Sequence, residues 1–260
     1  MTGRGRLVRV KRKFGWVKDS RDRRDKLFSV SLKVKKKLPK AVDLRKGLPP
    51  VYDQGNINGC TANAIAAAVE FDEIHQGMKD RFIPARLFIY YNEREREGTV
   101  DKDAGGQIRD GIKSIAGLGA PHEEMWPYEV KLVTVKPKSL CYTQAKRYRT
   151  VSYFRMMHHL DELKSCLASG FPFVFGIKVY ASFVGQRVAN TGIVEMPKKG
   201  EKVAGLHAVL ACGYDDSTNR FLVRNSYGAD WGLEGYFTIP YTYLLDPKLA
   251  HDFWTLRLIR

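Results

Sequence analysis

Long apolar runs are missing from this chain of 260 residues. No stretch approaches the roughly 18 consecutive apolar residues that a membrane-spanning helix needs, so we expect no membrane span. The basic N-terminus is not followed by the apolar region, about 7–15 residues long, of a secretory signal. Classical secretion is therefore not predicted, which leaves a cytoplasmic location or export by a specialised route.

Cysteine is also scarce, with four widely spaced residues at positions 60, 141, 166 and 212. No CxxC pair and no Cys/His spacing of a zinc site is present, so we predict no structural metal. If Cys60 is catalytic, three cysteines remain, an odd number that a disulfide framework would not use completely. We therefore interpret Cys141, Cys166 and Cys212 as buried thiols, which suits a reducing compartment.

Acidic charge is deficient at one end of the chain only. The formal net charge is +16, but residues 1–40 hold sixteen Lys/Arg against three Asp, and the remainder holds 28 basic and 25 acidic residues. We predict a basic N-terminal arm over residues 1–37, followed by a folded domain over residues 38–260. Three interpretations of the arm compete: a solvated tail, a contact with nucleic acid or another acidic surface, and an inhibitory segment laid over a cleft. A free tail has little use for bulky apolar groups, so we expect anchors at Phe14, Trp16, Leu27 and Phe28.

The folded part changes character near residue 150. Residues 61–71 are rich in alanine and apolar nearly all round, which predicts a buried helix, and further helical patterns cover 84–94 and 108–116. Beyond residue 150, β-rich runs are bounded by turn residues at 173–177, 208–211, 221–225 and 235–239, with one helix at 161–168. A helical half (about 51–150) followed by a strand half (about 151–260) predicts the α+β class. Clefts form naturally between two such halves.

Cys60 stands at the start of the predicted buried helix, after the glycine-containing turn 52–59. A helix N-terminus offers unpaired backbone N–H groups and partial positive charge, which lower the pKa of a thiol and favour the nucleophilic thiolate. The same N–H groups, together with the side-chain amide of Gln54, would donate hydrogen bonds to the oxyanion of a tetrahedral intermediate. This position therefore makes Cys60 a candidate nucleophile.

A thiolate nucleophile needs a partner that handles protons, and imidazole suits that task near neutral pH. Of the six histidines, His207 heads an apolar strand in Gly205-Leu206-His207-Ala208-Val209. Asn225 ends the next predicted strand, and adjacent antiparallel strands would bring the two side chains together. Trp231 is placed to cover that hydrogen bond and to keep water from competing for it.

At these residues the sequence resembles the papain-like cysteine peptidases, whose signature is a Gln-Gly turn leading into a Cys-headed helix. Gln54 precedes Cys60 by six residues and His207 follows it by 147, within the roughly 130–150 of this family. Asn225-Ser226-Tyr227-Gly228 resembles the family's Asn-Ser-Trp-Gly block. The resemblance covers about 38–260 and implies a two-lobed fold, a helical left lobe and an antiparallel β-barrel right lobe, with Cys60 and His207 on opposite walls of the cleft.

Some positions depart from the family pattern. Ile57 stands where the family has a disulfide cysteine, so that bridge is absent. Thr61 and Tyr227 replace tryptophans, which remodels the packing near the site. The stretch 54–65 looks most like the bacterial members of the family.

The resemblance implies a cysteine peptidase that acts on peptide or protein substrates without a metal or organic cofactor, with Cys60, His207, Asn225 and Gln54 as its catalytic residues. Gly105, Gly106 and Ala208 are expected to bind substrate. Such enzymes are commonly made with an N-terminal inhibitory segment, so the resemblance favours the arm as the occluding segment of a zymogen. We expect a monomer. Two alternatives remain open: a Cys/His acyltransferase, such as a peptide ligase or a transglutaminase-like enzyme, and a non-catalytic binding module on the same scaffold.

Overall fold

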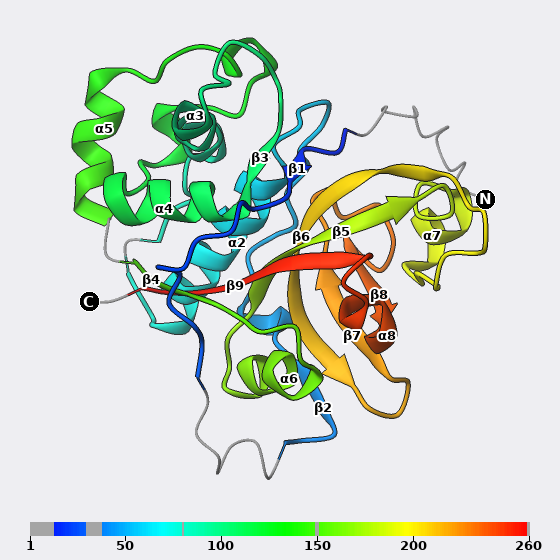
Figure 1. Ribbon diagram of the computed structural model, residues 1–260. Helices are drawn as coiled ribbons and strands as arrows, with labels where there is room; N and C mark the ends of the chain where they lie inside the picture. Colours follow the sequence, from blue (N-terminus) through cyan, green and yellow to red (C-terminus); the bar gives the residue numbers. More distant parts are fainter. Residues whose placement is uncertain (1–12, 30–37, 80, 149–150, 259–260) are drawn as a thin grey trace, which may run out of the picture.

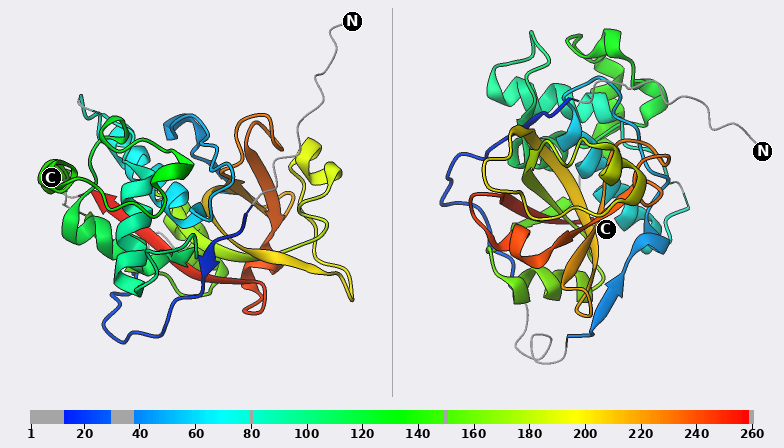
Figure 2. Two further views of the ribbon diagram at one scale, coloured as in Figure 1. Left: turned by 90° about the horizontal axis from the view of Figure 1, so that it is seen from above. Right: turned by 90° about the vertical axis from the view of Figure 1, so that its right-hand side faces the viewer.

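The computed structural model describes residues 13–29, 38–79, 81–148 and 151–258. They form a helical half and a β half that pack side by side (Figures 1 and 2). The helical half contains α2 (Cys60–His75), α3 (Arg86–Glu97), α4 (Ile108–Leu118) and α5 (Ser139–Ala145). Short 3-10 turns lie at Arg45–Gly47, Glu123–Met125, Val130–Leu132 and Lys146–Tyr148.

The β half is built on one antiparallel sheet of seven strands. Six of them lie in the order β4-β9-β5-β6-β7-β8, and β2 pairs with β6 outside this path. Their bounds are β2 (Ala41–Asp43), β4 (Val151–Arg155), β5 (Phe173–Tyr180), β6 (Val203–Asp215), β7 (Arg220–Arg224), β8 (Tyr236–Pro240) and β9 (Ala250–Leu258). The short helices α6 (Leu160–Ala168), α7 (Gln186–Thr191) and α8 (Tyr241–Leu245) connect the strands. The predicted α+β class is confirmed.

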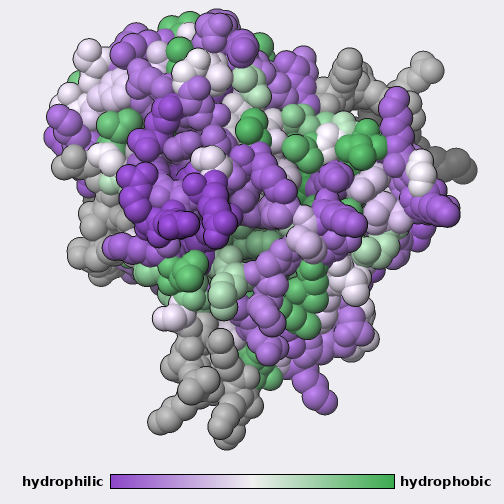
Figure 3. Space-filling view, in the orientation of Figure 1, coloured by the Kyte–Doolittle hydropathy of each residue, from purple (hydrophilic) through white to green (hydrophobic). Residues whose placement is uncertain are grey.

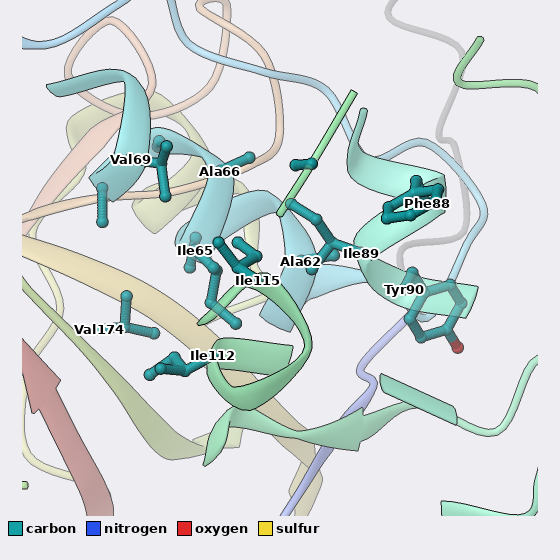
Figure 4. Packing of buried hydrophobic residues seen from close by; sticks show 14 of the residues in the cluster. Ala62, Ile65, Ala66, Val69, Phe88, Ile89, Tyr90, Ile112, Ile115 and Val174 are labelled. Atoms are coloured by element: carbon teal, nitrogen blue, oxygen red, sulfur yellow. The ribbon is translucent and has the colours of Figure 1, made fainter. Parts of the chain in front are cut away.

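Helix α2 runs through the interior of the molecule, as its all-round apolar pattern predicts. Figure 4 shows Ala62, Ile65 and Ala66 of this helix facing side chains of α3, α4 and β5. The small alanines let these neighbours approach closely, so the helix is buried over nearly its whole length. The helix begins at Cys60 after Gly59, and no side chain caps its N-terminus. The first backbone N–H groups therefore remain available to a site at this end.

The predicted strands of the β half were incomplete. Strands β4 and β9 were absent from the predicted elements, yet they pair with each other over Val151–Arg155. In β9, polar residues such as Asp252 and Thr255 interrupt the apolar pattern although both are buried. Strand β2 precedes the helical half in the chain but pairs with β6. The sheet therefore draws strands from both ends of the domain.

Part of the N-terminal arm lies against the body. Strand β1 (Trp16–Val17) pairs in parallel with β3 (Gly106–Gln107), and Figure 1 shows this segment crossing the boundary between the two halves. The same face is mainly hydrophilic over the helical half, with smaller hydrophobic patches elsewhere (Figure 3). Residues 1–12 and 30–37 lie outside the described residues, so the predicted acidic-surface contact of these basic segments stays a prediction. No helix in the described part of the chain is long and apolar enough to cross a membrane.

Candidate active site

Cys60 lies where the N-terminus of α2 meets strand β6. Its side chain is completely buried, and its Sγ accepts a hydrogen bond from the backbone N–H of Ala208 at 3.4 Å. Since Ala208 follows His207, the sheet brings the predicted base to the thiol. The two candidate residues therefore come from the two halves of the fold.

His207 is oriented by the predicted amide. Its Nε2 lies 2.8 Å from Oδ1 of Asn225, and the same oxygen accepts the backbone N–H of Ser226 at 2.8 Å. Strands β6 and β7 pair through Leu210 and Arg224, so Asn225, directly after β7, faces the start of β6. An acceptor at Nε2 fixes the ring's orientation and leaves Nδ1 as the nitrogen available to a proton-transfer role.

Aromatic rings surround the imidazole. Tyr227 stacks on His207 with ring centroids 5.0 Å apart, and Phe183 meets it edge-on at 6.1 Å. Trp231, predicted to cover the histidine–asparagine bond, packs on Tyr227 and Phe183 instead. Tyr227 therefore contributes the ring directly over His207. Phe183 was missed in the sequence, because it lies in a loop without a periodic pattern.

Gln54 is fixed on both sides of its amide. Its Oε1 accepts the Ser226 hydroxyl at 2.6 Å, so Nε2 is the donor end, and it donates to the carbonyl of Ile57 at 2.9 Å. Nε2 also donates to the backbone carbonyl of Lys13, in the arm, at 3.2 Å. The amide that was expected to bind an oxyanion thus already holds a carbonyl oxygen.

The predicted substrate-binding glycines hold the arm. The backbone N–H of Gly106 donates to the Gly15 carbonyl at 2.8 Å. Gly105 has φ of +80°, and a Cβ there would lie 2.1 Å from the Gly15 carbonyl oxygen. A side chain at Gly105 would therefore obstruct the segment of the arm that lies here. Phe14 packs on His207 with ring centroids 5.8 Å apart.

Burial reverses the expected ionisation of Cys60. Burial raises the pKa of the thiol to about 11 from its ordinary 9.0, although the backbone N–H groups of Ala208 and Gly15 lower it. The expectation of a lowered thiol pKa is wrong for this structure, in which Cys60 is fully buried. The loss of hydration raises the pKa more than the helix N-terminus lowers it. The thiol is therefore neutral at pH 7 while the arm is in place.

The remaining cysteines are free and buried, as is Cys60. No group of three or more His, Cys, Asp or Glu that could hold a metal ion occurs among the described residues. The side chains that meet at the site provide a thiol, an imidazole and two side-chain amides.

The thiol lies at a helix N-terminus in the helical half, and the imidazole, oriented by a side-chain amide, lies on the antiparallel sheet. This arrangement is a feature of the cysteine-dependent hydrolases. Residues 38–243 match the family of papain family cysteine proteases. The chain belongs to this family, whose members hydrolyse peptide bonds.

Individual relatives agree with this membership. An uncharacterized peptidase C1-like protein of Acanthamoeba polyphaga mimivirus is 42% identical over 95% of this chain and 88% of its own length. The crystal structure of xylellain, a cysteine protease from Xylella fastidiosa, is 43% identical, covers 95% of this chain and 96% of that one, and gives a TM-score of 0.89. Procathepsin L of Mus musculus is 26% identical over 84% of this chain, which spans 64% of its length. The predicted two-lobed papain-like fold is confirmed.

Proposed function

We propose that this protease cleaves peptide bonds with Cys60 as nucleophile, His207 as proton-transfer group and Asn225 as its orienting partner. The observation that carries the proposal is the 2.8 Å contact between His207 Nε2 and Asn225 Oδ1. Ala208, the residue that follows His207, donates its backbone N–H to the sulfur of Cys60 at 3.4 Å. Geometry of this kind is what general acid–base assistance to a thiolate requires.

The reaction follows from these positions. The Cys60 thiolate attacks the peptide carbonyl, a C–S bond forms, and the carbonyl electron pair moves to oxygen. Gln54 Nε2 and the Cys60 backbone N–H donate to that oxyanion. When the intermediate collapses, the C–N bond breaks and His207 gives its proton to the departing amine. Water then attacks the thioester, His207 takes the water proton, and the carboxylic acid product leaves.

Replacement of the nucleophile tests this assignment. We expect Cys60→Ala to lower peptide hydrolysis by at least about 10³-fold, with the far-UV circular dichroism spectrum unchanged. Cys141→Ala, which removes another buried thiol on α5, should keep the activity. Hydrolysis that survives Cys60→Ala would refute the mechanism. Reaction in the presence of an added amine, analysed by mass spectrometry, separates hydrolysis from acyl transfer.

We further propose that the arm inhibits the enzyme by filling the cleft. Lys13 places its carbonyl on Gln54, Gly15 bonds to Gly106, and Phe14 packs on His207. An ion pair between Lys13 Nζ and Asp103 at 2.8 Å adds an anchor on the helical half. These contacts occupy the groups that a substrate needs.

The arm also has the wrong chemistry for attack at Cys60. The Gly15 carbonyl oxygen accepts the Gly106 N–H at 2.8 Å, and the Gly15 N–H is among the groups near the sulfur that lower the pKa of the thiol. A substrate must present a carbonyl carbon at that position. We therefore expect the arm to block the site without being cut at Gly15.

Alkylation of Cys60 tests occlusion on the full chain. Trp16 is 4% exposed whereas its neighbour Val17 is 40% exposed, so Trp16→Ala should release the arm and Val17→Ala should not. We expect iodoacetamide to modify Cys60 at least about tenfold faster at pH 7 in Trp16→Ala, because a hydrated thiol regains a lower pKa. Peptide mapping by mass spectrometry gives the rate. Equal rates in the three proteins would exclude occlusion.

A further inference from the structure

The turn before the nucleophile carries both proposed oxyanion donors. Gln54 Nε2 stands at its start and the Cys60 backbone N–H at its end, and the residues between them form turns and bends, not a helix or a strand. Side chains from outside the turn hold one backbone carbonyl near each end. The Tyr128 hydroxyl donates to the Gln54 carbonyl at 3.2 Å, and Asn63 Nδ2 donates to the Gly59 carbonyl at 2.8 Å. These two bonds therefore help to set the positions of the two donors.

The protons in this network can be assigned. Arg86 Nη1 lies 2.9 Å from Asn63 Oδ1, and a guanidinium can only donate, so this contact identifies the amide oxygen. The amide nitrogen of Asn63 then faces the Tyr128 hydroxyl oxygen, to which it donates at 3.1 Å. Because that oxygen already accepts, the hydroxyl proton is left for the Gln54 carbonyl. The hydrogen bonds therefore run in one direction and end on the turn.

Arg86, at the start of this network, is itself firmly held. Glu123 accepts its Nε at 2.7 Å and its Nη2 at 2.6 Å, and the two side chains are only 10% and 16% exposed. The guanidinium carbon also lies 4.0 Å from the centroid of the Tyr128 ring and 4.6 Å from that of Tyr52. Paired, stacked guanidinium groups of this kind have little freedom to move. The ring of Tyr128 is therefore supported on its face as well as at its hydroxyl.

Gly59 leaves room for the hydroxyl. A Cβ at this position would lie 3.3 Å from the Tyr128 hydroxyl oxygen, whereas the φ of −89° at Gly59 does not require glycine. Burial raises the pKa of the Tyr128 phenol, the bond from Asn63 lowers it, and the nearby charge of Cys60 adds to the increase. The phenol therefore keeps its proton at neutral pH and remains a donor.

We propose that Tyr128 is a positioning residue for the oxyanion site, because its hydroxyl fixes the turn that carries the Gln54 and Cys60 donors. This inference rests on the proposed protease function. In this role Tyr128 acts through Gln54 and not on the substrate. The oxyanion exists only after attack on the peptide carbonyl, so misplaced donors should lower kcat and leave KM nearly unchanged.

Tyr128→Phe tests this role in the full chain with Trp16→Ala, the change expected to release the arm. It removes the hydroxyl and keeps the ring that Arg86 stacks on. We expect kcat for a peptide-aminomethylcoumarin substrate to fall about tenfold, with KM changed by less than about twofold. Tyr142→Phe is the matched control, since that hydroxyl donates to Asn92 Oδ1 at 3.1 Å and should leave kcat unchanged. The thermal midpoint shows whether each variant folds.

A peptide aldehyde separates the oxyanion site from the nucleophile. The Cys60 thiol adds to the aldehyde carbon, a C–S bond forms, and the aldehyde oxygen takes up the thiol proton, so the new hydroxyl lies at the oxyanion site. Iodoacetamide alkylates the sulfur, with loss of iodide, and creates no such oxygen. We expect Tyr128→Phe to weaken aldehyde binding about tenfold and to leave the alkylation rate at pH 7 unchanged.

The failures are distinguishable. Equal kcat and equal aldehyde affinity in Tyr128→Phe and Tyr142→Phe would overturn the positioning role and leave the protease function standing. A rise in KM without a fall in kcat, or alkylation slowed as much as aldehyde binding is weakened, would overturn it as well. Absence of hydrolysis in the Trp16→Ala parent would count against the proposed function itself, whereas the aldehyde affinities would still decide the role of Tyr128.

Discussion

At the scale of single residues, Glu93 of α3 is the least expected member of the site's surroundings. It is fully buried, its Oε2 accepts the hydroxyl of Thr61 at 2.9 Å, and a Cβ on Gly106 would lie 2.2 Å from its Oε1. Burial raises the pKa of this carboxyl well above its ordinary 4.5, and repulsion from Glu97 adds to the increase. Glu93 therefore packs as a neutral acid between Thr61 and β3, the strand that pairs with the arm.

The raised pKa of Glu93 makes the free energy of unfolding depend on pH, and a glutamine at this position would not have this effect. Because the folded pKa lies above the unfolded one, unfolding releases a proton as pH rises above about 4.5, and stability falls. We expect Glu93→Gln to become more stable relative to the parent as pH increases from 5 to 8, by up to about 1 kcal/mol per pH unit. Thermal unfolding at four pH values measures this difference. The exposed Glu124→Gln should show no such trend, and a pH-independent difference at Glu93 would contradict a neutral carboxyl.

At the scale of elements, the described arm has a second attachment beyond the cleft. Asp25 lies between two arginines, with Oδ2 3.2 Å from Arg109 Nη1 and 3.1 Å from Arg155 Nη1. The chain then forms a bridge from Leu27 to Arg155, and Phe28 donates its N–H to the Arg155 carbonyl at 2.8 Å. The prediction of Leu27 as an apolar anchor is wrong, because its side chain is 61% exposed. Backbone pairing and buried charge hold this part of the arm.

Removal of Asp25 should loosen the attachment. The side chains of Asp25 and Arg109 are 3% and 4% exposed, and loss of one partner in a buried pair typically costs about 3–5 kcal/mol. We expect Asp25→Ala to speed trypsin cleavage within residues 18–29 and to raise basal peptide hydrolysis several-fold. The control is Arg24→Ala, since Arg24 is 87% exposed and exposed pairs contribute about 0–1 kcal/mol. Similar cleavage rates in the two variants would contradict the role of the buried Asp25–Arg109 pair in holding the arm.

At the scale of the whole molecule, the arm joins both halves. Lys13 pairs with Asp103 on the helical side, whereas Asp19 accepts the Trp254 indole N–H at 2.7 Å on the sheet. Asp19 also donates its backbone N–H to Asp252 Oδ2 at 2.8 Å. Burial, and then the charge of Asp252, raise the pKa of Asp19 to about 7, although Trp254 and Arg109 lower it. The Asp19 and Asp252 carboxyls therefore lie near each other where the arm packs on the sheet.

This pair predicts that the arm docks more tightly at acidic pH. The docked pKa of Asp19 lies above its ordinary 3.8, so docking takes up a proton and weakens as pH rises from about 4 towards 7. The surrounding charges are Arg109, Arg155 and Lys18. We expect amide hydrogen exchange of residues 13–29, corrected for intrinsic rates, to lose protection between pH 5 and 7 in the parent. Asp19→Asn should remove most of this dependence, and an identical pH profile in that variant would exclude Asp19 as its source.

The sequence alone determined the class of fold and a set of chemically consistent residues. Helix α2 could be predicted because its all-round apolar alanine-rich pattern is local. Cys60 and Asn225 could be selected because they stand at the start of the predicted helix and at the end of a predicted strand. His207 could be selected because an apolar run follows it, and Gln54 because it lies six residues before Cys60. Which elements pair across the molecule is less visible, so β4 and β9 were missed, since burial of a polar strand depends on its partners.

Only the tertiary structure decided where the arm lies and how Cys60 ionises. Phe14 and Trp16 could be identified as apolar anchors, but their partners His207 and Gly176 are far along the chain. No local pattern specifies such a contact. The helix N-terminus predicts a lowered thiol pKa, whereas burial raises it, because hydration is a property of everything packed around the sulfur. The local sequence therefore identified the candidate reactive groups. Packing between segments that are distant in the chain decided how accessible these groups are.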